Sequence, residues 1–295
     1  MRGHPLFTAY LAFASVCFFW GTTYLGIRVA LESFPVFFLV SVRFLLSGGI
    51  LLCAVKWMGT PLPRWRDIWL TGFFGFLVLG VGNSCLTLSE QLIPSSLAAL
   101  FISISPIWMV CMEAAFPDGE RLKRGTIAGM LISMGGAGLL VGPDIFSQGF
   151  HGNNWKGFLL LQLGGISWGL GSILQRRHKA DIQPVASAAI QQLAAGLFFA
   201  PVALLERQPI HWDVKGIGAL WYLVVFGSIV GYTSYVIALN RLPISFSSLY
   251  TYVNPVVAAI LGWLFYREPF GWREVAAMCV IFLGVAIVKR YGHKP

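Results

Sequence analysis

Charged side chains are scarce in this chain of 295 residues. Asp, Glu, Lys and Arg make up 11% of it, whereas a soluble globular domain carries about 25%. Hydrophobic residues make up 57%, and the mean hydropathy is +0.73. So few charges could hardly cover the surface of a water-soluble protein of this length. The composition therefore excludes a cytoplasmic globular enzyme, a disordered tail and a fibrous protein, and it predicts an integral membrane protein.

The sequence also lacks the motifs of several reaction classes. It contains no GxxxxGK[ST] loop, so ATP is not expected to drive the protein directly. It has no HExxH motif and no pair of carboxylates inside an apolar run, so a membrane hydrolase would lack its catalytic groups. The histidines all lie in connections or tails, which argues against a histidine proton relay: His4, His151, His178, His211 and His293. We expect a protein that is not an enzyme and needs no cofactor.

Cysteine is rare and has no metal-ligand spacing. The five cysteines lie far apart inside apolar runs, with neither CxxC nor Cys/His patterns: Cys17, Cys53, Cys85, Cys111 and Cys279. A free cysteine in such a run behaves as a small buried hydrophobe. We expect neither a disulfide framework nor a metal site.

Basic residues outnumber acidic ones by 21 to 12, which gives a formal net charge of +9. They lie in short clusters between long apolar runs. Such clusters suit connections beside an anionic membrane surface rather than a groove that follows phosphates. We therefore expect the lipid bilayer, and not nucleic acid, as a partner.

Ten apolar runs are long enough to cross a bilayer, which requires about 20 residues. The fourth run carries Pro94 near its start and Pro106 inside, and the tenth is short unless 270–272 extends it. The runs are 7–27, 33–55, 68–89, 91–112, 125–143, 157–175, 182–205, 216–240, 242–266 and 275–288. The sequence therefore predicts an all-α integral membrane protein with ten transmembrane helices.

The basic residues predict its orientation, because cytoplasmic connections carry the excess of Lys and Arg. With ten spans, both termini lie on one side, and Arg43 lies within a span. Fourteen basic residues fall on the side of the termini: Arg2, Lys56, Arg64, Arg66, Arg121, Lys123, Arg124, Arg176, Arg177, Lys179, Arg241, Lys289, Arg290 and Lys294. Six fall on the other: Arg28, Lys156, Arg207, Lys215, Arg267 and Arg273. Both termini are therefore predicted to be cytoplasmic.

The chain repeats itself at an offset of 148 or 149 residues. Trp20-Gly21 recurs as Trp168-Gly169, and Pro106 recurs as Pro255. Each half, 8–142 and 155–290, holds five predicted spans. Because five is odd, the second half enters the membrane from the opposite face, which is the inverted repeat of many secondary transporters.

Three stretches carry a resemblance to a known family. WGTTYLGIR at 20–28, PVFFLVSVRF at 35–44 and YTYVNPVVAAILGWLFYRE at 250–268 are similar to the EamA family of the drug/metabolite transporter superfamily. The resemblance extends from about residue 8 to 290 and is closest to bacterial inner-membrane permeases. It implies a central cavity between two repeats that carries amino acids, other metabolites or xenobiotics, mostly outward. It also implies that the fifth and tenth spans are peripheral.

Arg43 is the ionisable group deepest inside a predicted span. It lies eight residues beyond Pro35, roughly 12 Å along a helix. A charge at that depth should face protein or water, either as a packing strut or as a fork for a substrate carboxylate. Glu90 ends the third span on the same side and is the expected ion-pair partner. Glu113 lies about 15 Å deeper, beyond reach, and is expected to extend to the cytoplasmic interface.

Polar and aromatic groups inside apolar runs complete the predicted site. Pro106 and Pro255 each remove a helix hydrogen bond, so these helix breaks either line the cavity, as the resemblance favours, or form fixed kinks. The tryptophans could alternatively anchor helices at the membrane interface, and the polar groups could bridge helices. The predicted substrate-binding residues are Trp20, Thr23, Tyr24, Arg43, Asn83, Ser103, Ser105, Trp168, Gln192, Tyr232, Tyr250, Tyr252 and Asn254.

These observations favour a secondary transporter of the inner membrane that exports small metabolites, such as amino acids or related amphipathic compounds, by alternating access. Two alternatives remain: a translocator of lipids or lipid-linked sugars, and a membrane scaffold without transport. A polar cavity would favour metabolites, whereas an apolar groove open to lipid would favour lipid translocation. A monomer is compatible with all three.

Overall fold

The computed structural model describes residues 5–93, 98, 101–119, 123–148, 154–178, 180, 182–266 and 271–292. Within these ranges all regular structure is helical and no strand occurs. Several residues used above lie outside them: Arg2, His4, Pro94, Arg121, His151, Lys179, Arg267, His293 and Lys294. The all-helical prediction is confirmed for the described part of the chain.

Among the residues that the structure describes, six segments are both long and apolar enough to cross a membrane, compared with the ten that the sequence predicts. Four are single helices: α1 (Pro5–Leu31), α2 (Val36–Trp57), α8 (Asn154–Arg177) and α9 (Pro184–Leu205). The other two each join an α-helix, a π-helix and a second α-helix: α3 (Trp65–Gly75), η1 (Phe76–Asn83) and α4 (Ser84–Leu92), and then α10 (Val214–Tyr222), η2 (Leu223–Tyr232) and α11 (Thr233–Arg241). The remaining helices are α6 (Ser105–Ala114), α7 (Arg124–Gln148), α12 (Ile244–Ser247), α13 (Tyr250–Tyr266) and α14 (Trp272–Gly292).

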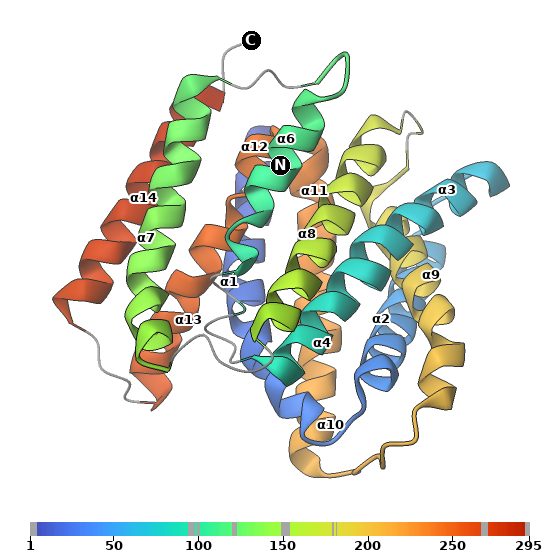
Figure 1. The fold of residues 1–295 in the computed structure, drawn as a ribbon. Coiled ribbons are helices and arrows are strands. Elements are labelled where there is room, and N and C mark those ends of the chain that lie inside the picture. Colours follow the sequence, from blue (N-terminus) through green and yellow to red (C-terminus); the bar gives the residue numbers. More distant parts are fainter. Residues whose placement is uncertain are drawn as a thin grey trace.

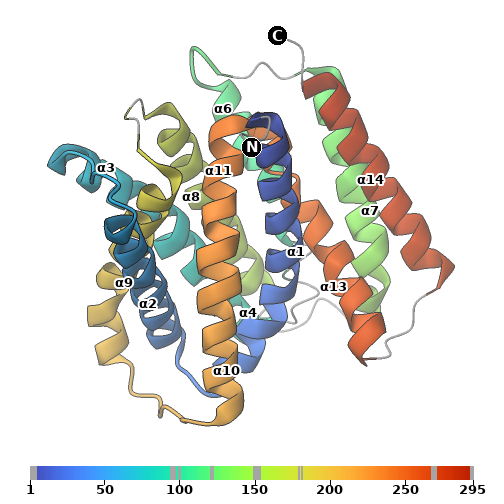
Figure 2. The same ribbon diagram turned by 180° about the vertical axis from the view of Figure 1, so that it is seen from behind.

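The helices form a central bundle with one peripheral pair. Helices α7 and α14 pack along each other at one side of the molecule, as Figure 1 shows. In the bundle, α2 packs against α9, α8 packs against η1 and α4, and α1 packs against α13 and the α10–η2–α11 segment. Figure 2 gives the reverse view, in which α1 begins and α14 ends at the same end of the molecule.

The fourth and ninth segments are interrupted, but not where the prolines stand. Residues 103–104 form a turn before α6, and Pro106 lies in the first turn of that helix. A proline is tolerated there because the first N–H groups of a helix have no partner within it. Pro255 lies inside α13, which continues through it, and the ninth segment is interrupted at 248–249, between α12 and α13. The predicted break at Pro255 is therefore displaced by several residues.

Close helix contacts at glycines are reciprocal between positions 148 residues apart. A Cβ added to Gly48 of α2 would lie 2.8 Å from Cγ of Leu193, and one added to Gly196 of α9 would lie 2.9 Å from Cγ of Leu45. The α7–α14 pair repeats the pattern, because Gly136 approaches Ile281 while Gly284 approaches Ser133. Ser133 Oγ also donates to the Ile281 carbonyl at 3.1 Å. The absence of a side chain at these glycines lets the paired helices approach closely.

At the end of the bundle opposite the chain termini, two acidic side chains accept hydrogen bonds from the backbone at the beginnings of helices. Glu206 accepts from the backbone N–H groups of Phe37 (3.1 Å) and Phe38 (2.8 Å) at the beginning of α2. Asp213 caps α10 by accepting from the N–H of Gly216 at 2.6 Å, and it also accepts from Ser33 Oγ at 2.7 Å. These donors, the Gly216 N–H first, lower the pKa of Asp213.

The cysteines are less uniformly buried than expected. Cys17 and Cys85 are buried, but Cys53, Cys111 and Cys279 are exposed on the protein surface. The expectation considered only water and protein, whereas a membrane-spanning helix also has a lipid-facing side where a small apolar group is stable.

Candidate substrate cavity

A cavity lies in the bundle, and the space between its walls, with the open part included, is about 780 Å³. Residues from α1, α2, the η1–α4 and η2 segments, α6, α8 and α13 line it. The lining consists of Trp20, Thr23, Tyr24, Ile27, Arg43, Phe44, Leu79, Gly82, Asn83, Leu86, Ile102, Ser105, Leu161, Gly164, Gly165, Trp168, Gly227, Ser228, Tyr232, Tyr250, Thr251 and Asn254.

The structure brings ten of the thirteen predicted substrate-binding residues to this cavity, all except Ser103, Gln192 and Tyr252. Ser103 is fully buried in the turn before α6. Gln192 lies between α2 and η2, where it accepts from Ser47 Oγ and donates to the carbonyl of Ser228 at 3.3 Å. Tyr252 is buried in a separate apolar cluster that includes residues of α7 and α14.

Arg43 is the charged side chain in the lining, and it is only 5% exposed. Its Nε donates to Ser228 Oγ at 2.7 Å. On the other side, a Cβ added to Gly227 would lie 2.8 Å from Arg43 Nη2, so the absence of a side chain there makes room for the guanidinium. With Nε held by Ser228, the guanidinium is fixed at the cavity wall in an orientation that suits a planar, two-pronged acceptor such as a carboxylate.

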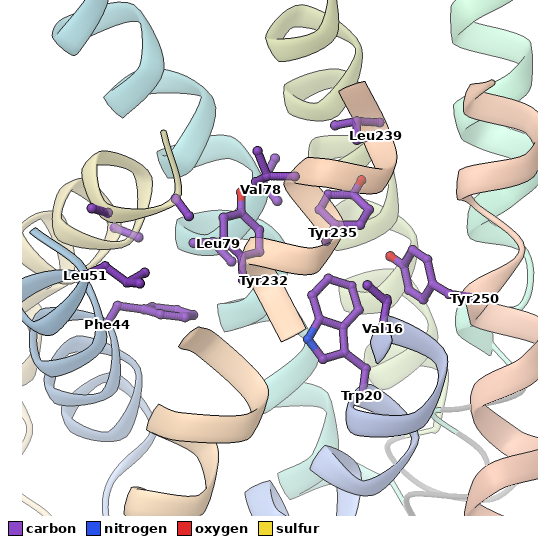
Figure 3. Close-up of a cluster of buried hydrophobic side chains, with 14 of the residues drawn as sticks. Val16, Trp20, Phe44, Leu51, Val78, Leu79, Tyr232, Tyr235, Leu239 and Tyr250 are labelled. Carbon is purple, nitrogen blue, oxygen red and sulfur yellow. The ribbon is translucent and has the colours of Figure 1, made fainter. Parts of the chain in front are cut away.

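Aromatic rings form another wall, with Trp20 at its centre (Figure 3). The Trp20 ring lies 5.0 Å from that of Tyr250 and 5.4 Å from that of Trp168, both edge to face. Trp20 Nε1 donates to the Gly227 carbonyl at 2.9 Å, and Trp168 Nε1 donates to the hydroxyl of Tyr235 at 3.0 Å. These bonds satisfy the indole N–H groups, so the ring surfaces remain available for apolar parts of a ligand.

Glu90 does not form the predicted contact with Arg43. Neither carboxylate oxygen has a hydrogen-bond partner among the described residues, although both are shielded from solvent. Glu90 lies in the neighbourhood of Arg43 and of Arg28 at the end of α1, but no hydrogen bond or ion pair joins it to either arginine among the described residues.

Glu113 has a partner that the sequence argument did not consider. Arg177 Nη2, at the end of α8, lies 2.8 Å from Glu113 Oε1 at the end of α6. One residue further, His178 Nε2 lies 3.2 Å from Asp67 Oδ1 in the first turn of α3. These two contacts connect the ends of α3, α6 and α8, and Glu113 pairs with Arg177 within the protein.

Three functional candidates were missed in the sequence. Ser228 and Thr251 line the cavity, and Tyr235 accepts from Trp168 behind it. A hydroxyl in an apolar run marks Ser228 as unusual, but only the fold reveals that Arg43 faces it. Pro255 has no N–H for the carbonyl of Thr251, four residues earlier, and Thr251 lines the cavity.

Residues 165–169 (GISWG) match the GxSxG spacing of hydrolase nucleophile elbows, a match the sequence argument overlooked. That motif requires a sharp strand-to-helix turn. Here it lies inside α8, and Ser167 Oγ donates to the Leu77 carbonyl at 2.8 Å. The structural context of a nucleophile elbow is therefore not met.

A mostly apolar cavity with a few polar side chains, placed among membrane-length helices, is typical of a membrane transporter. The EamA-like transporter family matches the chain twice, over residues 7–142 and 155–290. The uncharacterized inner membrane transporter YedA of Escherichia coli (strain K12) is 32% identical, over 98% of this chain and 92% of its own length. Protein PecM of Dickeya dadantii is 25% identical, over 94% and 91% of the two chains. A protein of known crystal structure, 20% identical, superposes with a TM-score of 0.81 over 97% of this chain and 99% of its own, and so shares the fold.

This chain therefore belongs to the EamA-like transporter family, as the motifs in its sequence predicted. It is a membrane transporter.

Proposed function

We propose that this protein is a secondary transporter that exports small amphipathic metabolites, amino acids among them, across the bacterial inner membrane. The observation that carries the proposal is Arg43, a guanidinium fixed by Ser228 at the wall of a cavity that also presents Trp20 and Trp168. A cation and aromatic rings in one cavity suit a ligand with a carboxylate and an apolar body. A lipid translocator would need an apolar groove open to the bilayer, and a scaffold would need no cavity.

Alternating access would follow from two five-helix halves, 8–142 and 155–290, related by a pseudo-two-fold axis in the membrane plane. Support comes from the two family matches, whose starts and ends are each 148 residues apart. The glycine contacts also support it, because reciprocal contacts between equivalent positions are what a two-fold axis produces. The packing follows the same exchange: α1 contacts η2, α11 and α13, while α8 contacts η1, α4 and α6.

The first experiment is a toxicity-rescue screen, in which cells that overproduce the protein are exposed to amino acids and their analogues. We expect growth to be restored for compounds with a carboxylate and an apolar side chain. Labelled forms of the compounds for which growth is restored should then leave loaded cells faster when the protein is present. Rescue confined to lipophilic compounds without a carboxylate would refute the proposed substrate class.

A further inference from the structure

The connection between α2 and α3 carries charged side chains that the transport cavity does not use. Residues 56–66 contain no Asp or Glu and three basic side chains, all of them exposed: Lys56, Arg64 and Arg66. No ion pair joins any of the three to an acidic side chain in the described part of the chain. The next residue, Asp67, is occupied elsewhere, because its Oδ1 lies 3.2 Å from His178 Nε2. The positive charge of this connection is therefore not compensated within the described structure.

Three tryptophans stand among and beside these charges and face away from the protein. Trp57 is 91% exposed, Trp65 is 70% exposed and Trp69 is 65% exposed. Trp65 and Trp69 are one helical turn apart, so they share one face of α3, and their rings lie edge to face at 5.5 Å. Large rings beside basic groups suit the headgroup region of a bilayer, where the ring meets acyl chains and the charge meets phosphate.

The beginning of α3 projects from the bundle, as Figures 1 and 2 show from opposite sides. The buried residues of this helix all lie in its second half, from Thr71 onward. The apolar segment Trp65–Leu92 has 28 residues, which corresponds to roughly 42 Å of helix. The hydrocarbon core of a bilayer is only about 30 Å thick. The segment is therefore long enough for the end with Trp65 to lie among the lipid headgroups.

The connection that lies 148 residues later in the chain has a different character. Residues 56–67 carry three basic side chains and one acidic one, whereas 204–215 carry two of each. Both acidic side chains of the later connection bind within the protein. Glu206 accepts from backbone N–H groups of α2, and Asp213 accepts from the N–H of Gly216. The fold thus accounts for the acidic groups of one connection and leaves the basic groups of the other without a partner inside the protein.

We propose that the surface formed by residues 56–69 binds the headgroup of an anionic phospholipid. Arg64 and Arg66 flank Trp65, and guanidinium groups bind phosphate oxygens in pairs. A basic segment beside a membrane helix attracts anionic lipid. A free phosphate ion would match the charge but would leave the three exposed tryptophan rings uncovered, so a lipid is the expected occupant. The site lies outside the cavity, and it does not depend on which substrate is transported.

Native mass spectrometry of the purified full-length protein can measure this binding. We expect the first molecule of phosphatidylglycerol to bind more tightly than phosphatidylcholine with the same acyl chains. Each basic side chain near the headgroup contributes about a fivefold gain in affinity. Arg64→Gln combined with Arg66→Gln should therefore weaken phosphatidylglycerol binding by more than about tenfold and leave phosphatidylcholine binding unchanged. Lysine at both positions should retain most of the affinity, because both charges remain.

The matched control removes two exposed basic residues from the later connection, by Arg207→Gln combined with Lys215→Gln. This control should bind phosphatidylglycerol as the wild type does. Equal affinities of the wild type for the two lipids, or equal losses in the two glutamine variants, would overturn the proposal. Displacement of the lipid by inorganic phosphate would also overturn it, because the site would then be one for free phosphate. A wild-type dimer that becomes monomeric in the variant at 64 and 66 would assign this surface to a second copy of the chain instead.

Thermal unfolding in detergent gives a second measurement. A ligand that binds only the folded protein raises the midpoint of unfolding. Phosphatidylglycerol should raise the midpoint of the wild type and of the control more than phosphatidylcholine does, and this difference should vanish in the glutamine variant at 64 and 66. A difference that persists in that variant would place the lipid site elsewhere and refute the proposal.

Discussion

Arg43 is the residue on which recognition of the substrate is expected to depend. Arg43→Lys keeps the positive charge but loses the planar fork and the Nε donor that Ser228 accepts. Loss of hydrogen bonds to a charged group costs about 1.5–3 kcal/mol, which corresponds to about a ten- to hundredfold loss of affinity. We expect Arg43→Lys to reach the membrane but to transport carboxylate substrates poorly, and Arg43→Gln to lose them. Efflux of a labelled amino acid from vesicles with matched protein levels is the measurement.

The same vesicles distinguish recognition from stability. Near-normal efflux by Arg43→Gln would reduce this arginine to a structural strut. Failure of every Arg43 variant to accumulate, with accumulation restored when Glu90 is also replaced, would mean that the two charges serve folding alone.

Gly227 offers a test of the space around the guanidinium. A Cβ at this position would lie 2.8 Å from Arg43 Nη2 and 3.0 Å from Thr23 Cγ2. Gly227→Ala should therefore displace the guanidinium and raise the KM for export several-fold, with little loss of protein in the membrane. Gly218→Ala is the matched control, because nothing lies within 4 Å of its Cβ. Equal KM values for the two variants would show that the position of Arg43 does not limit binding.

At the scale of the helices, the contact between α2 and α9 predicts a contrast between neighbouring residues. A Cβ at Gly48 would lie 2.8 Å from both Cγ and the backbone N of Leu193, whereas nothing lies within 4 Å of a Cβ at Gly49. Overpacking a tight contact costs about 1–3 kcal/mol, while Gly to Ala in an open helix position gains about 0.5–1 kcal/mol. Gly48→Ala should lower the midpoint of thermal unfolding in detergent, and Gly49→Ala should leave it equal or higher. A lowered midpoint in Gly49→Ala alone would contradict this packing.

The helices also show which structural features the sequence can predict and which it cannot. Apolar run length predicts the membrane-length helices because lipid forces every backbone group to bond within its own segment. A proline predicts only that one backbone N–H is missing. For that reason the sequence predicted a helix break at Pro255, which lies inside α13, and not the interruption at 248–249. Turns at 103–104 and 248–249 depend on packing between segments distant in sequence.

The candidate site follows the same division. Polar and aromatic groups in apolar runs must avoid lipid. This rule led to the prediction of Trp20, Asn83 and eight other residues that line the cavity. The same rule does not distinguish residues that line the cavity from residues that lie between helices. Gln192 is of the second kind, and it donates to the Ser228 carbonyl. The rule could not identify Ser228 itself, because an isolated serine is common in membrane helices and its partner Arg43 lies 185 residues away.

For the whole molecule, the arrangement of helices bears on how the cavity could open. The contacts from Arg177 to Glu113 and from His178 to Asp67 connect α8 to α6 and α3 at one end. At the opposite end Glu206 accepts from the backbone at the beginning of α2, and Asp213 accepts from Ser33 Oγ. A transporter that exposes its cavity first on one side and then on the other would have to release one set of contacts while keeping the other. Among the described lining residues none belongs to the peripheral α7–α14 pair, which suits a fixed support.

The orientation of the molecule in the membrane gives the last prediction. Helix α1 begins and α14 ends at the same end of the bundle (Figure 2), which is the arrangement that ten membrane spans would require. With ten spans, the sequence predicts fourteen basic residues on the side of the termini and six on the other, and the richer side is expected to be cytoplasmic. A fluorescent reporter fused after Pro295 should therefore be active, and alkaline phosphatase at the same position inactive. Phosphatase fused at His211, in the connection between α9 and α10, should be active as the matched control. An active phosphatase after Pro295 would invert the orientation and place Arg177 and Glu113 outside the cell.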